Sequence, residues 1–538
     1  MSTLPQPSND DLVCLAYGVG HGEEGVCLLV KMGPYRILLD CGLADISPLI
    51  TEDHLPVCDL VLCSHAHADH ARGLLDLHRT FPKLPIYTSE VTNLLLPLNW
   101  LDQADGVPQF GQALPWRRSI EFQDGLTAEL FPAGHLPGAA AILLTYTGFY
   151  HSYSVFYTGD FFLSNSRLVE GLHLDSLRNL HPDVLIVEGT YGTARHPHRR
   201  QQENTLMAQI DRAINQQRSI ILPVTTLGIA QELLILLRSH HLFTGRDVDI
   251  WVDGTIVAGC DSYLQLLPHF PPSVQNFARH QALFWDEKVR PHVRQLTSEN
   301  LPSIHQRPCI IITDTYIDLN IYTEGHPFPW LILFPAQSHG MTVLPATTTE
   351  IVIDTYLLSE HSDGAGTAQL IHNIRPKHIV FVHGSSTYLA DLTALEELQN
   401  RYHLHAPASG TLVSLPIGDT FIQPAPPADP HYEGESIELE QEINLTLPKA
   451  ITSDPRWHNF ADTGLIEARW QGEEITIRGI SQREILNQQQ KLNLPPEIEC
   501  CGNCRYYRGS RCVNLRSPLH GFKVTPDGYC PAFESEQV

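Results

Sequence analysis

Short apolar runs bounded by turn residues cover the first 190 residues of the chain. Examples are LVCLAYG, VCLLVK, YRILLDCG, LVLCSH, AAILLTYTG and SVFYTGD, and each run stops at a Gly, Asp, Lys or His. Runs of this kind are typical of β-strands, and the stretch ARGLLDLHRTF between them has helical spacing. The pattern therefore predicts a layered α/β domain that is rich in sheet.

A different pattern covers residues 203–345. ENTLMAQIDRAINQQ and AQELLILLRSHH have helical spacing, whereas SIILPV, VDIWVDG and CIIITDTY are continuous apolar runs. Strands that alternate with helices indicate a second unit with a parallel sheet, because buried parallel strands are apolar on both faces. EIVIDTYLL and HIVFVHG then return to the first pattern, so we expect the second unit to interrupt the first domain.

The end of the chain changes in composition twice. IQPAPPADPHYEGES is rich in proline and acidic residues, as linkers are, and the last stretch is rich in cysteine. We therefore expect six segments: the first part of a core domain (1–200), an inserted domain (201–348), the second part of the core (349–422), a linker (423–433), a small β-rich accessory segment (434–497) and a Cys-rich metal-binding module (498–538).

Composition and charge narrow the class of protein. Of the 538 residues 43% are hydrophobic and 18% are charged, which excludes a disordered chain. The 35 Lys and Arg face 60 Asp and Glu, a net charge of -25. This balance argues against binding nucleic acid by bulk charge, although bound divalent cations or a local basic patch reverse the field locally. The sequence lacks both a secretion signal and an apolar run of about 18 residues, so we expect a cytoplasmic protein with no membrane partner.

The strongest chemical signal is the run SHAHADH at residues 64–70, directly after the apolar run LVLC. A strand that ends in a sharp loop lets His65 and His67 converge, and it directs Asp69 and His70 to a second position. Imidazole and carboxylate groups suit Zn²⁺ or a similar first-row ion. The run therefore predicts a zinc site.

Further residues at strand ends supply what such a site still lacks. His135 lies on the Gly/Pro turn GHLPGAA, Asp160 ends the run SVFYTGD, and His383 ends the run VFVHG. Asp160 is a carboxylate that is able to bridge two ions. Asp40, at the end of YRILLD, is the natural hydrogen-bond acceptor for a ligand histidine. Together these residues predict a dinuclear site.

These motifs resemble those of the metallo-β-lactamase superfamily. HAHADH matches the H-x-H-x-D-H signature of that superfamily, and Asp40, His135 and Asp160 stand where its flanking motifs fall. The resemblance covers roughly residues 12–420. It implies an α/β fold, an αββα metallo-β-lactamase sandwich, into which a cap domain is inserted.

Three more motifs resemble the β-CASP branch of nucleic-acid hydrolases, most closely RNA-processing nucleases of the cleavage-factor type. Glu188 in EGTYG, His361 in SEHSD and His383 in VHG stand at motifs A, B and C of that branch. Motif C is His in members that act on RNA and usually Val in members that act on DNA. His383 therefore favours RNA as the substrate.

The resemblance also implies a role for each residue. One zinc ion would be held by His65, His67 and His135, and the other by Asp69, His70 and His383, with Asp160 bridging. Two ions about 3.5–4 Å apart lower the pKa of a bridging water and stabilise the attacking and leaving oxygens. The residues implied as catalytic are Asp40, Asp69, Glu188 and His361, with His361, held by Glu188, protonating the leaving alkoxide.

The cap departs from the family pattern in two places. Gln231 and Glu232 match it, but no Arg precedes them, and DTYIDLNIYTEGHP replaces an expected Gly-rich loop. Substrate contacts are instead predicted in ARHPHRR, where a solvated basic loop is the alternative interpretation. The predicted phosphate contacts are Arg195, Arg199 and Arg200.

The 12 cysteines fall into two groups. The first seven lie singly in apolar runs, as buried free thiols do, and the other five crowd residues 500–530. Four thiolates suit tetrahedral Zn²⁺ or a [4Fe–4S] cluster, and we favour zinc. The predicted ligands are Cys501, Cys504, Cys512 and Cys530, with Cys500 as a spare thiol.

The sequence thus favours a dinuclear zinc phosphodiesterase that hydrolyses single-stranded RNA, with endonuclease and 5′-exonuclease modes both open. Two alternatives remain: a hydrolase of a small ester or thioester, and a non-catalytic scaffold subunit of an RNA-processing complex. A homodimer and an RNA-processing assembly both stay open as partners beyond the RNA.

Overall fold

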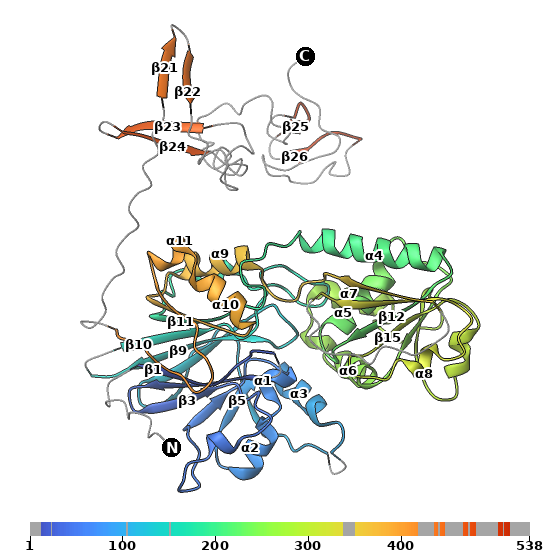
Figure 1. Ribbon diagram of the computed structural model, residues 1–538, viewed down its shortest axis with the longest axis horizontal. Helices are drawn as coiled ribbons and strands as arrows, with labels where there is room; N and C mark the ends of the chain where they lie inside the picture. Colours follow the sequence, from blue (N-terminus) through green and yellow to red (C-terminus); the bar gives the residue numbers. More distant parts are fainter. Residues whose placement is uncertain are drawn as a thin grey trace. The chain divides into compact units, whose positions relative to one another are not determined.

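The computed structural model describes residues 12–22, 24–103, 106–149, 152–336 and 350–417, four strands between 435 and 479, and the stretches 504–508 and 511–516. The chain divides into two units, residues 1–427 and 428–538. The first unit, blue to orange in Figure 1, contains the core domain and the inserted cap.

The first sheet of the core has seven strands in the order β20-β1-β2-β3-β4-β5-β6. Strands β1 to β3 form an antiparallel meander, and β3 to β6 run parallel. The strands are β1 (Val13–Val19), β2 (Val26–Met32), β3 (Tyr35–Leu39), β4 (Leu60–Leu62), β5 (Ile86–Ser89), β6 (Gly111–Leu114) and β20 (Leu412–Ser414).

The second sheet of the core has the order β19-β18-β11-β10-β9-β8-β7. Strands β7 to β10 are antiparallel, whereas β10, β11, β18 and β19 are parallel. The strands are β7 (Ile120–Gln123), β8 (Leu126–Pro132), β9 (Ala140–Thr147), β10 (Ser152–Tyr157), β11 (Val184–Glu188), β18 (His378–Val382) and β19 (His403–His405). Because β18 pairs with β11, the chain after the cap returns to the core.

The two sheets pack face to face. Their inner faces share a fully buried cluster that includes Leu28 and Val30 of β2, Ile142 and Leu144 of β9, and Ile186 of β11. Figure 1 shows helices on the outer face of each sheet, so the core is an αββα sandwich, as the sequence predicts. The helices are α1 (Ala68–Ala71), α2 (Leu74–Thr80) and α3 (Glu90–Leu95) on one side, and α9 (Gly364–Ile374), α10 (Ser386–Thr393) and α11 (Glu396–Gln399) on the other.

The cap is built on a separate six-stranded sheet, in the order β14-β13-β15-β12-β16-β17, whose neighbours are all parallel. Its central strands are buried on both faces, which explains their continuous apolar runs. The strands are β12 (Ser219–Val224), β13 (Asp249–Val252), β14 (His292–Gln295), β15 (Ile310–Asp314), β16 (Trp330–Pro335) and β17 (Ile351–Tyr356).

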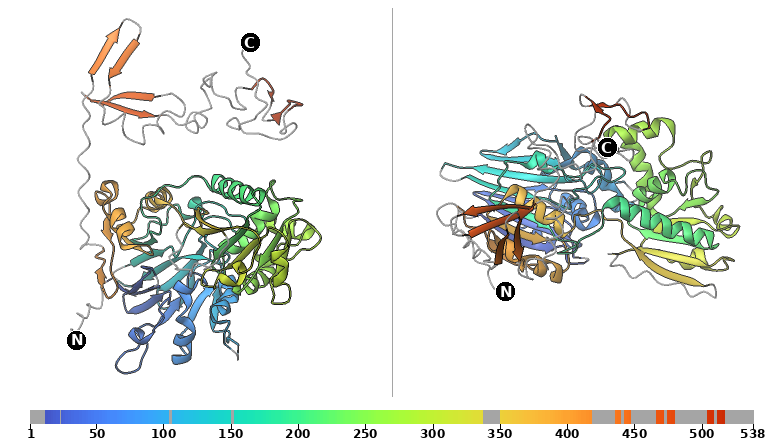
Figure 2. Two further views of the ribbon diagram at one scale, coloured as in Figure 1. Left: turned by 45° about the vertical axis from the view of Figure 1, so that its right-hand side comes forward. Right: turned by 90° about the horizontal axis from the view of Figure 1, so that it is seen from above.

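Five α-helices accompany the cap sheet, and Figure 2 shows the cap beside the core in a view from above. They are α4 (Arg199–Asn215), α5 (Ile229–Ser239), α6 (Thr255–Gln265), α7 (Pro272–His280) and α8 (Asn320–Thr323). Short 3₁₀ turns complete the first unit: η1 (Ser47–Leu49), η2 (Leu96–Trp100), η3 (Leu174–Leu177), η4 (Leu267–His269) and η5 (Leu301–His305). Among the described residues, no helix has the length and apolar character that crossing a bilayer requires.

One strand lies in a different sheet from the one that the sequence pattern indicated. EIVIDTYLL was expected to open the second part of the core, but Ile351–Tyr356 pairs with β16 and forms the edge of the cap sheet. An apolar run predicts a strand, but the strand's neighbour in the sheet depends on contacts that the run does not specify. The cap therefore extends to Tyr356, and the core resumes after it.

A polar anchor holds the cap against the core. Glu232 on α5 accepts hydrogen bonds from the backbone N–H groups of Arg167 and Leu168, each at 2.8 Å, and from the hydroxyl of Ser166, also at 2.8 Å. A buried apolar cluster that includes Leu168 of the core and Leu233 of α5 surrounds this anchor. Glu232, which the sequence matched to the family's cap pattern, thus joins the two domains.

In the second unit the described residues form three antiparallel hairpins. Two of them lie in the segment that the sequence predicts to be β-rich, and the third lies in the Cys-rich tail. Their strands are β21 (Glu435–Leu439), β22 (Glu442–Thr446), β23 (Ile466–Gln471), β24 (Glu474–Gly479), β25 (Tyr507–Arg508) and β26 (Arg511–Cys512). The predicted linker lies outside the described residues.

A cluster of three histidines joins the start of β18 to β19. The ring of His378 stacks on those of His403 and His405, with centroids 5.1 and 5.4 Å away. Its Nδ1 lies 3.2 Å from His405 Nε2, and its Nε2 lies 2.9 Å from the carbonyl oxygen of Pro416. Neutral rings satisfy both contacts: His378 donates to Pro416 and accepts from His405.

We predict that this cluster makes the fold sensitive to acid. Burial and the two neighbouring histidines lower the pKa of His405 to about 4. The unfolded chain binds this proton below its ordinary pKa of about 6.5, so the folded state loses stability as the pH falls from about 6.5 to about 4. His405→Gln should therefore lose less stability between pH 7 and pH 5 than the wild type does, as measured by urea unfolding. His280→Gln, at an exposed position on α7, is the control and should follow the wild type; a parallel loss in all three proteins would contradict the prediction.

Candidate metal centre and active site

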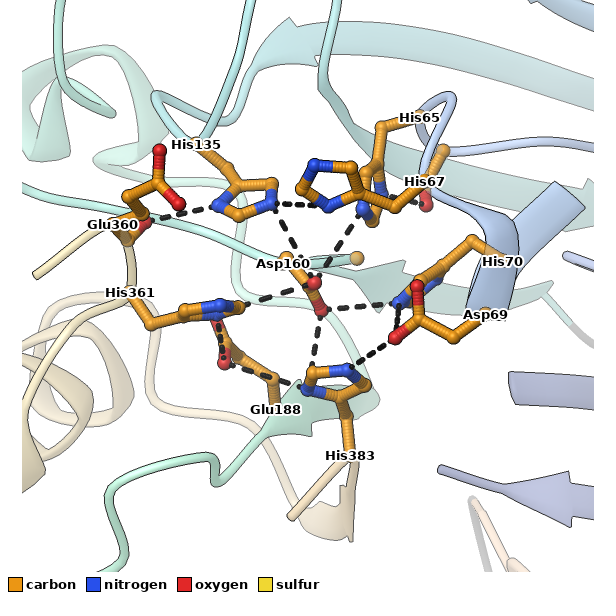
Figure 3. A network of polar contacts seen from close by, with 12 residues as sticks. His65, His67, Asp69, His70, His135, Asp160, Glu188, Glu360, His361 and His383 are labelled. Carbon is orange, nitrogen blue, oxygen red and sulfur yellow. Dashed lines mark hydrogen bonds and ion pairs between the residues drawn. The ribbon is translucent and has the colours of Figure 1, made fainter. Parts of the chain in front are cut away.

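Strand ends of both core sheets bring the predicted residues to one place (Figure 3). His65 and His67 follow β4, Asp160 follows β10, Glu188 ends β11, and His383 follows β18. Side chains at the carboxyl ends of neighbouring parallel strands share one edge of a sheet, which explains why residues so far apart in sequence converge. Every core ligand that the sequence indicated lies in this cluster.

The first group consists of His65, His67, His135 and Asp160, whose ligand atoms all lie within 4.8 Å of one another. Asp160 Oδ2 lies 3.4 Å from His65 Nε2 and 3.7 Å from His135 Nε2. His135 Nε2 lies 3.0 Å from His67 Nδ1. Three imidazoles and one carboxylate thus face a common point.

The second group consists of Asp69, His70 and His383. Asp160 Oδ1, its other oxygen, lies 3.3 Å from His70 Nε2 and 3.4 Å from His383 Nδ1. His383 Nε2 lies 3.1 Å from Asp69 Oδ2. Asp160 therefore presents one oxygen to each group, as a carboxylate between two cations does.

Unsatisfied polar atoms show that the cluster suits metal ions. His65 Nε2, His70 Nε2 and Asp160 Oδ1 are buried and have no hydrogen-bond partner. A buried polar atom without a partner is costly, and a cation at each group would satisfy all three atoms. Nitrogen and carboxylate donors are those that Zn²⁺ takes in proteins. The donor set therefore fits two divalent cations.

The charges of the two groups differ. At the first group, burial and the neighbouring imidazole of His65 lower the pKa of His67 to about 3, and burial also lowers the pKa of His65. These rings are neutral, which is the form that binds a metal. At the second group, burial opposes a charge on His383, but Asp160, Asp69 and Glu188 outweigh it and raise its pKa to about 10. The carboxylates there require positive charge, which a cation supplies.

Asp40 orients the second group from behind. It is fully buried and accepts hydrogen bonds from the N–H and hydroxyl of Ser64 at 2.6 and 2.7 Å, and from the hydroxyl of Tyr157 at 2.6 Å. His70 Nδ1 lies 2.7 Å from Asp40 Oδ2. A carboxylate only accepts, so Nδ1 carries the proton and Nε2 presents its lone pair to the site. Ser64 and Tyr157, which the sequence reasoning did not single out, complete this arrangement.

Glu188 holds His361 at the opposite side of the cluster. Glu188 is buried, accepts from the backbone N–H of Phe161 at 2.6 Å, and lies 2.8 Å from His361 Nδ1. Burial opposes a charge on His361, but Glu188 outweighs it and raises the pKa of the imidazole. His361 Nδ1 also lies 4.0 Å from Asp160 Oδ2. The pair thus places next to the two groups an imidazole whose protonated form is favoured by Glu188.

Two histidines of the first group are oriented by main-chain carbonyls near the domain junction. His135 Nδ1 lies 3.0 Å from the carbonyl oxygen of Glu360, and His67 Nε2 lies 3.4 Å from that of Leu227. Leu227 belongs to the cap, between β12 and α5. The cap therefore contacts a predicted metal ligand directly. Main-chain acceptors leave no side-chain pattern, so the sequence reasoning missed both.

The three predicted arginine contacts separate in the structure. Arg195 and Arg200 are exposed, whereas Arg199 is buried at the start of α4. Arg199 pairs with Glu203 at 3.6 Å and with Glu232 at 3.3 Å. Its guanidinium is therefore part of the domain junction and not of a phosphate-binding surface. Neighbouring residues of a helix point in different directions, and the run ARHPHRR does not reveal which of them faces inward.

The structure describes nine of the 12 cysteines. The seven singly placed cysteines are buried free thiols, as expected: Cys14, Cys27, Cys41, Cys58, Cys63, Cys260 and Cys309. In the tail, Cys504 and Cys512 are buried, and the N–H of Tyr507 donates to the carbonyl of Cys504 at 2.9 Å. Cys501 and Cys530 lie outside the described residues.

A two-sheet αββα core with clustered histidines and carboxylates at its strand ends defines the class of metallo-hydrolases. Residues 35–220 match the family described as the beta-lactamase superfamily domain. Residues 350–407 match the Zn-dependent metallo-hydrolase RNA specificity domain.

Three relatives add to this. The uncharacterised protein sll0514 of Synechocystis sp. is 49% identical over 97% of this chain and 96% of its own length. Probable RNase MJ4 of Methanocaldococcus jannaschii is 30% identical over 43% of this chain, and cleavage and polyadenylation specificity factor subunit 3 of Dictyostelium discoideum is 23% identical over 72% of it. The chain spans only 56% and 55% of the length of these last two proteins.

The chain belongs to the metallo-β-lactamase superfamily and, within it, to the β-CASP branch of metal-dependent RNA nucleases. The resemblance seen in the sequence motifs is thereby confirmed.

We predict that the cap loop supports metal binding at the first group. Gly228 has φ +87°, and a Cβ there would lie 2.7 Å from Glu360 Oε1, so Gly228→Ala should displace the neighbouring Leu227 carbonyl. Losing a partner that orients a ligand histidine typically weakens metal binding about 10- to 100-fold. Competition with a chromophoric chelator should show this loss at one zinc site.

Gly325→Ala is the matched control. Gly325 also lies in the cap and has φ +66°, but nothing lies within 4 Å of its added Cβ. Equal effects of the two substitutions would show that backbone strain alone, and not the Leu227 contact, affects the metal site.

Proposed function

We propose that the protein is a two-zinc phosphodiesterase that hydrolyses single-stranded RNA. The observation that carries this proposal is the position of Asp160, which presents one oxygen to each of two ligand groups beside the Glu188–His361 pair. Its motif C histidine, His383, and the match to an RNA specificity domain favour RNA over DNA.

In this proposal His65, His67 and His135 hold one zinc ion, Asp69, His70 and His383 hold the other, and Asp160 contacts both. When bound, the two ions supply Lewis-acid polarisation of the phosphate and a nucleophile at neutral pH. Asp40 keeps His70 in the tautomer that presents Nε2 to the site.

The remaining chemistry falls to His361. Cleavage of a phosphodiester leaves an alkoxide that needs a proton, and a positioned imidazole accelerates such a transfer about 10²- to 10⁴-fold. Glu188 occupies Nδ1 of His361, so Nε2 is the atom that gives its proton to the leaving oxygen. The alternative of a small-ester or thioester hydrolase gives the Glu188–His361 pair no comparable role.

RNA would meet few positive side chains outside the metal site. Arg195 is exposed between β11 and α4, Arg200 is exposed in the first turn of α4, and we propose that both contact phosphates. Arg199 is not part of this proposal because it is buried in ion pairs.

We predict that two substitutions will separate metal binding from proton transfer. Asp69→Ala should lose the second zinc ion and cleavage of end-labelled single-stranded RNA. His361→Asn should keep two core zinc ions but lose about 10²- to 10⁴-fold in cleavage rate. Elemental analysis measures the zinc content of each protein. Activity is measured on RNA labelled at the 5′ or 3′ end, and a thioester is assayed as an alternative substrate.

His280→Gln serves again as the surface control. Cleavage that survives Asp69→Ala, or fewer than two core metal ions per wild-type chain, would contradict the proposal. Hydrolysis of the thioester without cleavage of RNA would favour the ester-hydrolase alternative, and two bound ions without either activity would favour the scaffold alternative.

We further propose that Cys501, Cys504, Cys512 and Cys530 bind a structural zinc ion. The supporting observation is the turn at Cys504, followed by a hairpin that pairs Tyr507 with Cys512. Two buried thiols held by a turn and a hairpin resemble half of a tetrahedral zinc site.

Cys504→Ser should therefore remove one metal ion per chain and leave RNA cleavage by the core in place. Elemental analysis of zinc and iron in wild type and variant distinguishes zinc from an iron–sulfur cluster. Cys260→Ser, which changes a buried thiol in the cap, is the control. An unchanged metal count in Cys504→Ser would contradict this site.

A further inference from the structure

Thr190 lies where the three β-CASP motifs meet. Its Oγ1 donates to Glu188 Oε2 and lies 2.8 Å from His383 Nδ1 and 3.5 Å from His361 Nδ1. The motifs imply roles for Glu188, His361 and His383, but none for the hydroxyl of Thr190. That hydroxyl nevertheless contacts one residue of each motif.

The direction of the hydrogen bonds follows from elementary chemistry. A hydroxyl has one proton, and the carboxylate of Glu188 can only accept it. Thr190 Oγ1 must then accept from His383, so His383 carries its proton on Nδ1. The other nitrogen, Nε2, lies 3.1 Å from Asp69 Oδ2 and is the one left to bind a metal ion at the second group.

The backbone holds Thr190 in this position. The N–H of Gly189 donates to the carbonyl oxygens of both Val382 and His383, each at 2.9 Å. The loop after β11 is thereby tied to the end of β18, and Thr190 cannot move away from His383 without breaking these bonds. Threonine also has a stiff χ1 angle, which favours a fixed direction for the hydroxyl.

The same arrangement recurs at the other side of the cluster. His65 Nδ1 lies 3.0 Å from Ser64 Oγ, and Ser64 Oγ donates to Asp40 at 2.7 Å. Each outer carboxylate thus holds one histidine directly and a second one through a hydroxyl. Asp40 holds His70 directly and His65 through Ser64, and Glu188 holds His361 directly and His383 through Thr190.

We propose that Thr190 is a positioning residue that relays Glu188 to His383 and so fixes the second zinc site. The proposal rests on the proposed zinc-dependent function, because it requires an ion at Asp69, His70 and His383. Glu188 then has two roles, since the carboxylate that supports the proton donor His361 also supports a metal ligand.

Thr190→Val tests the relay because it keeps the shape of the side chain and removes the hydroxyl. The zinc affinities of the metal-free protein are measured by chelator competition, without reference to activity. Thr190→Val should weaken one of the two core zinc sites about 10- to 100-fold and leave the other core site unchanged. Thr190→Ser keeps the hydroxyl and should bind zinc like the wild type.

Thr313→Val is the matched control. Thr313 is a fully buried threonine in β15 of the cap, and its hydroxyl bonds to that of Tyr322 at 2.8 Å. This variant should keep both zinc affinities. Ser64→Ala extends the test, because it should weaken one zinc site on its own and both sites when combined with Thr190→Val.

Wild-type zinc affinities in Thr190→Val, or equal weakening in Thr190→Ser, would overturn the relay. Should Thr190→Val not fold, which circular dichroism reveals, Thr190→Ala takes its place and the same criteria hold. Two core zinc sites without RNA cleavage in the wild type would contradict the proposed function alone, whereas unaltered zinc binding in Thr190→Val with intact cleavage would contradict the relay alone. A wild type that binds no zinc at the core site would contradict both.

Discussion

The carboxylate of Asp160 is the constraint on which the core depends. It is 2% exposed, its two oxygens face different groups of histidines, and one of them has no hydrogen-bond partner. A buried charge of this kind is tolerated only when positive charge lies next to it. The edge of the sandwich meets this need in two ways: the carboxylates outweigh burial and raise the pKa of His383 on one side, and the neutral imidazoles on the other side suit a bound cation.

Two further carboxylates make this arrangement rigid. Asp40 and Glu188 stand outside the metal groups, and each accepts a hydrogen bond from a backbone N–H as well as from side chains. Because their own positions are fixed by strands of the two sheets, the histidines that they hold are fixed too. Loss of such an outer partner typically weakens metal binding about 10- to 100-fold. The two sheets therefore fix the ligand histidines indirectly, through the hydrogen bonds of Asp40 and Glu188.

The sequence predicts most of this arrangement because the ligands follow strands. A short apolar run that ends in His or Asp predicts a strand and a polar side chain at its end, so the places of His65, Asp160 and His383 after strands could be predicted from the sequence. The Leu227 carbonyl could not, because a main-chain acceptor has no pattern. Nor could the burial of Arg199 or the place of Ile351–Tyr356 in the cap sheet, since both depend on which surfaces meet in three dimensions.

Net charge must be considered locally. The chain carries -25 overall, yet the acidic residues that matter most are turned inward: Asp40, Asp160 and Glu188 are buried, and Glu232 is used to anchor the cap. Divalent cations at the ligand groups would reverse the field locally, so the net charge by itself does not exclude an anionic substrate there. If an anionic substrate binds mainly at the metal site, its affinity depends on how the ligand histidines are oriented. The cap contributes to this through Leu227, which orients His67. A change in the position of the cap would therefore alter the contact between the Leu227 carbonyl and His67 of the first group.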